Sequence, residues 1–301
     1  MSEALDRDEF DQLVGDLRPR LHRYCARMTG SVIDGEDVLQ DALLKATAAL
    51  PHSGPLDRPD KWLFRIAHNT ALDFLRRRAR REAAHADEEL EMIVDPVDPL
   101  HDRLVVAASL RTFMLLPAPQ RGSVILRDVL GYSVAETSEI MESTIPAVKS
   151  ALQRGRARLS DLSSKVDDVA PPSLSEADAE RLDAYVNLFN ARDFDAVRAM
   201  LADDVRLDLV NRLQMRGRVE VGEYFHRYAL GYDWRLVPGF VDGRPSILVC
   251  DPDDDGGRPR YFVLLDFAAE AIASIRDFRF APYAIEGAEV FAIRVPRRTE
   301  L

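Results

Sequence analysis

The sequence predicts three folded parts: two all-α helical bundles, the second a helix-turn-helix, followed by an α+β domain. Through the first half of the chain, apolar residues recur at three- and four-residue steps, which is the period of a helix. Proline-containing segments at 95–99 and 171–172 interrupt this pattern, and after the second one the apolar residues alternate in short runs typical of β-strands. A length of 301 residues accommodates two or three such domains.

The first bundle, residues 1–81, is predicted from three amphipathic helices. The first covers 10–28 and is closed by Gly30, and the second covers about 35–50. The third begins near Asp60, after a proline-containing loop, and runs into an arginine cluster at its end. Residues 82–102 are acidic and contain two Asp-Pro steps, which favour extended backbone, so they predict a linker.

The second bundle is predicted between residues 103 and 165. Its four expected helices cover 104–116, 120–129, 134–141 and 145–159. The last two have helix-turn-helix spacing, in which the second helix presents its first residues to the major groove of DNA. Ser143 or Thr144 can cap that helix, and Pro146 fits its first turn. Its polar and basic side consists of Lys149, Ser150, Gln153, Arg154, Arg156 and Arg158.

The third domain is predicted over residues 173–298, where the pattern changes to mixed helix and strand. Helices are expected near 182–189, 197–201 and 219–230. Strands are expected at 205–210, 235–241, 246–250, 261–267, 272–280 and 290–295, with a hairpin turn at 253–257. This mixture predicts an α+β domain.

Composition and charge narrow the class of function. Cys25 and Cys250 lie far apart and in no metal-ligand spacing, so neither a disulfide framework nor a zinc site is predicted. The acidic N-terminus lacks the features of a signal peptide, and no apolar run approaches membrane-spanning length, so we expect a cytoplasmic protein without a cofactor. The net charge of −11 argues against DNA binding, but basic residues cluster at 76–81 and 149–158 and provide two local surfaces for it.

Several motifs in the two bundles point to one family. In the first bundle they are Glu36-Asp-Val-Leu-Gln-Asp-Ala-Leu-Leu-Lys45, Trp62-Leu-Phe-Arg-Ile-Ala-His-Asn69 and Asp73-Phe-Leu-Arg-Arg-Arg78. In the second they are Leu116-Pro-Ala-Pro-Gln-Arg121, Val124-Ile-Leu-Arg-Asp-Val-Leu-Gly131, Val148-Lys-Ser150 and Arg154-Gly-Arg156. Together, and in this order, they resemble the two modules of extracytoplasmic-function (ECF) RNA polymerase sigma factors. One departure is Glu142, which stands in the helix-turn-helix turn where this family often has glycine.

The resemblance implies two partners, core RNA polymerase and promoter DNA. It implies that the 36–45 motif binds polymerase, through Glu36, Asp37, Gln40 and Asp41. The near-start (−10) promoter element falls to the third helix, with Arg65, His68, Asn69, Asp73, Arg76 and Arg77. The upstream (−35) element falls to the polar side of the helix-turn-helix. Such a protein is not an enzyme, because it lends promoter recognition to the polymerase.

The third domain resembles the SnoaL-like cone fold through Tyr185-Val-Asn-Leu-Phe-Asn-Ala-Arg-Asp-Phe-Asp195 and the run that follows it. The candidates for a ligand pocket are His226, Tyr261 and Asp277, and a small-molecule ligand would bind there. None of them sits in a recognisable catalytic motif. We therefore expect this domain to regulate the sigma modules in cis.

Two other functions stay open from the sequence. An ordinary helix-turn-helix regulator would bind DNA without polymerase, but it would need neither the 36–45 motif nor the 62–69 motif. A SnoaL-like enzyme with a decayed sigma half would turn over a small hydrophobic substrate.

Overall fold

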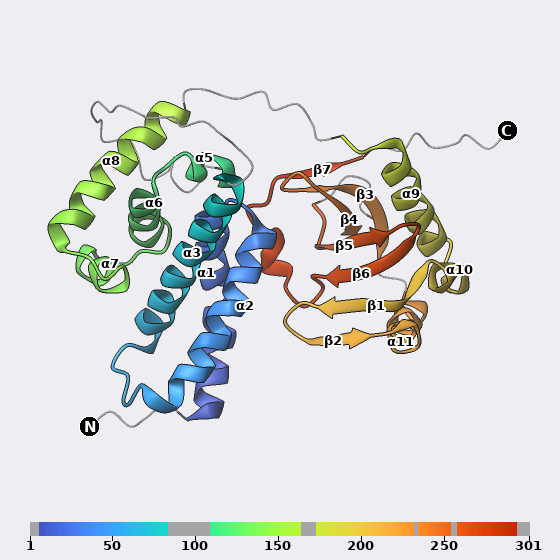
Figure 1. Cartoon of the computed structure of the whole chain (residues 1–301), viewed down its shortest axis with the longest axis horizontal. Helices are drawn as coiled ribbons and strands as arrows, with labels where there is room; N and C mark the ends of the chain where they lie inside the picture. The colour runs from blue at the N-terminus through green and yellow to red at the C-terminus, as the bar shows by residue number, and fades with distance from the viewer. Residues whose placement is uncertain (1–5, 84–108, 164–172, 232–233, 254–257, 294–301) are drawn as a thin grey trace. The chain divides into compact units, whose positions relative to one another are not determined.

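The computed structural model describes residues 6–83, 109–163, 173–231, 234–253 and 258–293. The chain forms two compact units, Met1–Asp168 and Val169–Leu301. The first unit is helical and the second contains a sheet (Figure 1). The predicted joint at 171–172, most of the linker at 82–102 and most of the hairpin turn at 253–257 lie outside the described residues. In the parts of the chain described, no helix is long and apolar enough to cross a membrane.

The first module consists of α1 (Arg7–Thr29), α2 (Val32–Ala49), the short 3-10 helix Leu50–His52 and α3 (Pro59–Ala83). A capping box of Asp6 and Glu9 starts α1, and Gly30 ends it with a φ of 82°, a left-handed conformation that glycine adopts without strain. The Ser31 side chain caps α2 by accepting from two backbone N–H groups. The three predicted helices are confirmed.

The second module contains α5 (Leu110–Met114), α6 (Ala118–Val124), the π-helical turn Ile125–Val129, α7 (Val134–Ile140) and α8 (Ile145–Ser163). The helix-turn-helix prediction is confirmed by α7 and α8. Ser133 and Glu136 form the capping box of α7, and the Thr144 hydroxyl accepts from the N–H of Ala147 at the start of α8. Glu142, in the turn between them, has a φ of 50°.

The two modules share one hydrophobic core instead of forming two separate bundles, which the sequence did not predict. The ring of Phe64 in α3 packs edge-on against Tyr132 of the second module, with their centroids 5.3 Å apart. Arg121 of α6 is 5% exposed and donates to the carbonyl oxygen of Met28 at the end of α1. The same guanidinium donates to the carbonyl oxygen of Leu116 at 2.8 Å. These contacts hold α1, α3 and the second module in one unit.

The second unit is α+β, as predicted, with a seven-stranded sheet in the order β2-β1-β6-β5-β4-β3-β7. Its helices are α9 (Glu176–Asn190), α10 (Phe194–Ala199), α11 (Arg218–Ala229) and the 3-10 turn Pro282–Ile285. Its strands are β1 (Leu201–Leu209), β2 (Leu213–Arg216), β3 (Arg235–Val241), β4 (Arg244–Cys250), β5 (Tyr261–Ala268), β6 (Ala271–Asp277) and β7 (Val290–Ala292). Strands β1 and β6 are parallel, and the other neighbours are antiparallel.

The second unit differs from prediction near Leu201, in β2 and at the end of β6, which stops at Asp277 instead of continuing to residue 280. Leu201 begins β1 and does not end the preceding helix, because its backbone already pairs with Ile272 of β6. Strand β2 was not predicted, since its four mostly exposed residues give no alternating apolar pattern.

Candidate nucleic-acid and polymerase interface

The polar side of α8, predicted to face DNA, has three exposed members. Val148 and Leu152 are buried in the shared core, whereas Lys149, Gln153 and Arg154 are exposed on the opposite side of the helix. The Nη1 of Arg154 donates to the Ser150 hydroxyl at 2.7 Å. The second helix of the helix-turn-helix therefore has three donor-rich side chains that a duplex can reach.

Arg156 has a different place from the one predicted. Its guanidinium makes two hydrogen bonds to the carboxylate of Asp128, at 2.9 and 2.5 Å, and the Asp128 side chain is only 3% exposed. This bidentate pair fixes α8 against the preceding turn, so we remove Arg156 from the base-reading residues. Arg158 is half-buried.

The predicted −10 surface lies along α3. Asn69, Asp73, Arg76 and Arg77 are exposed there, and Arg65 is half-buried. The Nη1 of Arg76 pairs with Asp73 at 3.0 Å, one turn away. An exposed pair of this kind adds little stability, so Asp73 and Arg76 stay accessible to a nucleic-acid ligand.

His68 is a correction to this surface. It is 3% exposed, and its Nδ1 lies 2.6 Å from the hydroxyl of Tyr24, inside the helical unit. Burial lowers the pKa of His68 to about 4, so the ring is neutral at pH 7. His68 therefore packs inside the closed helical unit and is not part of its exposed −10 surface.

The predicted polymerase-docking face of α2 contains one further correction. Asp37 and Asp41 are exposed and Gln40 is half-buried, as a docking surface requires. Glu36 is 0% exposed and forms an ion pair with Arg18 of α1 at 2.5 Å, which leaves it no surface for a partner. Leu44, which the sequence reasoning passed over, is 70% exposed on the same side as Asp37 and Asp41.

The predicted ligand residues of the second unit lie in two different places. Asp277 is fully buried, and its Oδ2 accepts from the hydroxyls of Tyr224 at 2.8 Å and Tyr228 at 3.0 Å. Tyr261 joins this group, because its hydroxyl lies 3.1 Å from that of Tyr228. Burial raises the pKa of the Asp277 carboxyl above its usual value.

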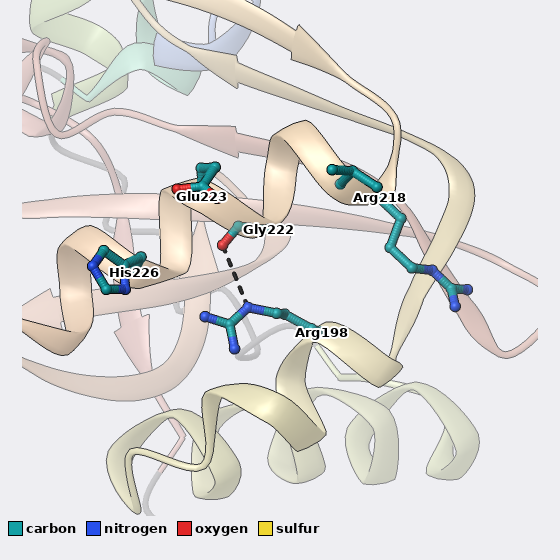
Figure 2. Close-up of a pocket in the computed structure, with 6 residues that line it drawn as sticks. Arg198, Arg218, Gly222, Glu223 and His226 are labelled. Atoms are coloured by element: carbon teal, nitrogen blue, oxygen red, sulfur yellow. Dashed lines mark hydrogen bonds between the residues drawn. The ribbon is translucent and has the colours of Figure 1, made fainter.

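His226 lies on the opposite side of α11, exposed and facing away from this buried group. It lines an open groove of about 500 Å³ together with Arg198, Arg218, Val219, Gly222 and Glu223 (Figure 2). The Nη1 of Arg198 pairs there with Asp195 at 2.6 Å. The prediction of one pocket containing His226 and Asp277 is therefore wrong. In the described ranges, no three His, Cys, Asp or Glu side chains converge as a metal site requires.

Comparison with known proteins assigns both helical modules. Sigma-70 region 2 matches residues 13–81, and Sigma-70, region 4 matches residues 110–159. The ECF RNA polymerase sigma factor SigG of Mycobacterium tuberculosis is 27% identical over 92% of this chain and 85% of its own length. SigM of the same species is 35% identical over 53% of this chain and 79% of its own length.

Solved structures of SnoaL- and NTF2-like proteins overlap the C-terminal part of the chain. One is an NTF2-like protein from Cytophaga hutchinsonii, which is 16% identical, with a TM-score of 0.24, over 33% of this chain and 95% of its own. The match to SigG extends through the same part. The two helical modules, their order and the two sigma-factor relatives, SigG and SigM, agree. The chain therefore belongs to the extracytoplasmic-function (ECF) RNA polymerase sigma factors, alternative sigma factors that direct promoter recognition by core RNA polymerase.

Proposed function

We propose that this sigma factor reads promoter DNA with α8 and α3, docks on polymerase with α2, and is regulated in cis by its α+β domain. The observation that carries the proposal is the exposure of Lys149, Gln153 and Arg154 on the second helix of the helix-turn-helix. Guanidinium, ammonium and amide groups are the donors that read guanine and adenine edges and bind phosphates in a major groove. The −35 element is their target.

We expect Arg154→Ala to weaken binding of a −35 duplex and to make the affinity less dependent on salt, because a phosphate contact releases one counterion. The slope of log affinity against log salt concentration should fall by about 0.9. Fluorescence anisotropy of the holoenzyme on a labelled duplex at several salt concentrations measures this slope. The matched control is Arg216→Ala, which removes an exposed arginine of β2. An unchanged slope for Arg154→Ala would reject the phosphate role.

The polymerase contact is assigned to the outer side of α2. Asp37 and Asp41 present carboxylates, and Gln40 adds an amide. Leu44, one turn further along the same side of α2, adds an exposed apolar side chain. Acids around an exposed apolar side chain suit a basic partner surface, because charge steers the encounter and apolar burial stabilises the complex.

The α+β domain is proposed to regulate and not to catalyse. A general acid or base must reach its substrate, but both oxygens of Asp277 are occupied. The Oδ2 accepts from Tyr224 and Tyr228, and the Oδ1 accepts from the N–H of Arg279 at 2.8 Å. We place a small-molecule ligand of this domain at the groove of His226, because that groove is open to solvent.

Regulation in cis is tested by removing the second unit. A chain that ends at residue 170 should change the run-off transcript made with core polymerase by at least about fivefold relative to the full chain, since couplings of this kind amount to 1–3 kcal/mol. A promoter library supplies the template for both proteins. Adding the α+β domain as a separate protein to the shortened chain shows whether its effect needs the covalent link. Equal transcription from the full and shortened chains would contradict regulation in cis.

A further inference from the structure

An acidic stripe on the second module faces the first module inside the helical unit. We define the stripe as Glu136, Glu139 and Glu142, which follow one another at three-residue steps along α7 and its end. In α7 this spacing places side chains on one side of the helix. The stripe therefore presents a row of carboxylates in one direction.

Each acid of the stripe bonds to a donor at the start of α3 or along it. The first accepts from the Nη1 of Arg58 at 3.0 Å, the second pairs with the Nζ of Lys61, and the third accepts from the Nδ2 of Asn69 at 3.1 Å. The partners are 78, 78 and 73 residues apart in the sequence. All three bonds thus join the helix-turn-helix module to the module proposed to hold the −10 element.

The donors that the stripe occupies are those that DNA would use. Arg58, which also pairs with Asp60 at 3.0 Å, and Lys61 are the cationic side chains at the start of α3, and Asn69 belongs to the proposed −10 surface. Protein groups bind DNA strands largely by donating from cationic and amide side chains to phosphate oxygens. A row of carboxylate oxygens offers the same donors an equivalent set of acceptors.

The closed unit cannot hold both promoter elements at once. Elements centred near −10 and −35 are roughly 25 base pairs apart, which is on the order of 85 Å at 3.4 Å per pair. A compact body of about 160 residues is only roughly 40 Å across. The two modules must therefore separate before α3 and α8 engage one promoter.

Glu142 provides an independent observation. Its φ of 50° lies in the left-handed region, where a side chain is strained and glycine is not. Despite this strain, Glu142 supplies a carboxylate that accepts from Asn69, whereas glycine at this turn would have no side chain to accept the bond.

We propose that the Glu136–Glu139–Glu142 stripe is an internal mimic of the DNA backbone, which occupies Arg58, Lys61 and Asn69 until core polymerase separates the modules. The other exposed residues of the −10 surface stay uncovered. This inference rests on the proposed assignment of the −10 surface to α3. It makes the free sigma factor a poor DNA binder for a local reason that is separate from the acidic charge of the whole chain.

A stripe variant tests the mimic directly. It combines Glu136→Gln and Glu139→Gln with Glu142→Gly, so the capping box of α7 keeps a suitable residue and the strained turn is relieved. We expect the free full-length variant to bind a single-stranded −10 oligonucleotide, taken from the library promoters that yield transcripts, about three- to thirtyfold more tightly than the unmodified chain. Fluorescence anisotropy without polymerase gives the affinities.

The control variant removes the same number of negative charges elsewhere. It carries Glu180→Gln, Asp204→Asn and Glu270→Gln, at exposed positions of the second unit. Its affinity should change by less than about twofold, since distant surface charges are screened. Equal gains in the stripe and control variants would overturn the proposal, because general charge would then explain the effect.

A zero-length cross-link follows the contact itself. Carbodiimide should form an amide between Lys61 and Glu139 in the free chain, detectable by peptide mass spectrometry, and the yield should fall at least about fivefold in the holoenzyme. A cross-linked chain that still supports transcription would overturn the proposal. If the unmodified holoenzyme initiates normally but the stripe variant gains no affinity, this inference alone fails. If the holoenzyme initiates from no promoter, the proposed function fails.

Discussion

The helical unit is expected to lose about 3 kcal/mol of stability for each of two buried histidines as the pH falls from 6.5 to about 4. Burial lowers the pKa of His22 and His68 from 6.5 to about 4. In the unfolded chain both imidazoles bind a proton near pH 6.5, whereas in the folded chain they stay neutral until about pH 4. Their contribution is therefore complete above pH 6.5 and is lost progressively below it.

The contacts of the two rings explain why protonation is resisted. The Nε2 of His22 lies 2.9 Å from the carbonyl oxygen of Val32, and the ring is 1% exposed. The Nδ1 of His68 lies 2.6 Å from the hydroxyl of Tyr24, at a position 3% exposed. A charged imidazolium at either place would lose its hydration, and burial is the largest cause of both pKa shifts.

Urea unfolding followed by helical circular dichroism, at pH values from 7.5 to 4.5, measures this loss. The double change His22→Gln and His68→Gln should flatten the dependence of the unfolding free energy on pH, even where it lowers stability at every pH. His52→Gln, at an exposed position, should leave that dependence unchanged. The same pH dependence in all three proteins would show that the two rings do not control it.

Replacing Arg18 by methionine is expected to destabilise the helical unit by about 3–5 kcal/mol, because it leaves the Glu36 carboxylate buried without the guanidinium beside it. The two groups are 2.5 Å apart, and their side chains are 9% and 0% exposed. Attraction between the two charges offsets their lost hydration only while both are present. Replacing both, as Arg18→Met with Glu36→Leu, should recover most of the loss.

Urea midpoints of the single and double variants test this coupling. The control is Arg7→Met, which breaks an exposed pair with Asp11 and should leave the midpoint almost unchanged. Independent, additive effects of the two substitutions in the core would contradict a coupled pair. Glu36→Gln separates a folding role from a polymerase-binding role. If Glu36 acts in folding, this substitution lowers the urea midpoint of the protein measured without polymerase.

The sequence predicted those parts of the structure that local chemistry decides. Gly30 marked the end of α1, and the helix-turn-helix followed from periodicity and capping. The Ser31 cap of α2 was missed, because that helix was expected to begin near residue 35. The burial of Glu36 and His68 could not be predicted from the sequence. Glu36 is buried against Arg18 of α1 and His68 against Tyr24 of α1, and no local sequence pattern indicates either contact.

The predicted pocket was wrong because Tyr224 and Tyr228, and not His226, are the residues of α11 that contact Asp277. Successive helical residues differ by about 100°, so His226 and Tyr228, two residues apart on α11, point in nearly opposite directions. The buried hydroxyl of Tyr228 and the exposed ring of His226 show this divergence. The shared core of the two modules was a different case, since periodicity identifies an apolar face but not the element that covers it.

The shared core also affects how tightly this factor can hold both elements of one promoter. When only an open fraction of a protein can bind, its apparent dissociation constant is the intrinsic one divided by that fraction. Parting the modules exposes Phe64 and Tyr132 and breaks the bond from Arg121 to Met28, so every such contact reduces the open fraction. A sigma factor built in this way holds both promoter elements more weakly by that fraction, and any influence that loosens its core strengthens its hold on the promoter.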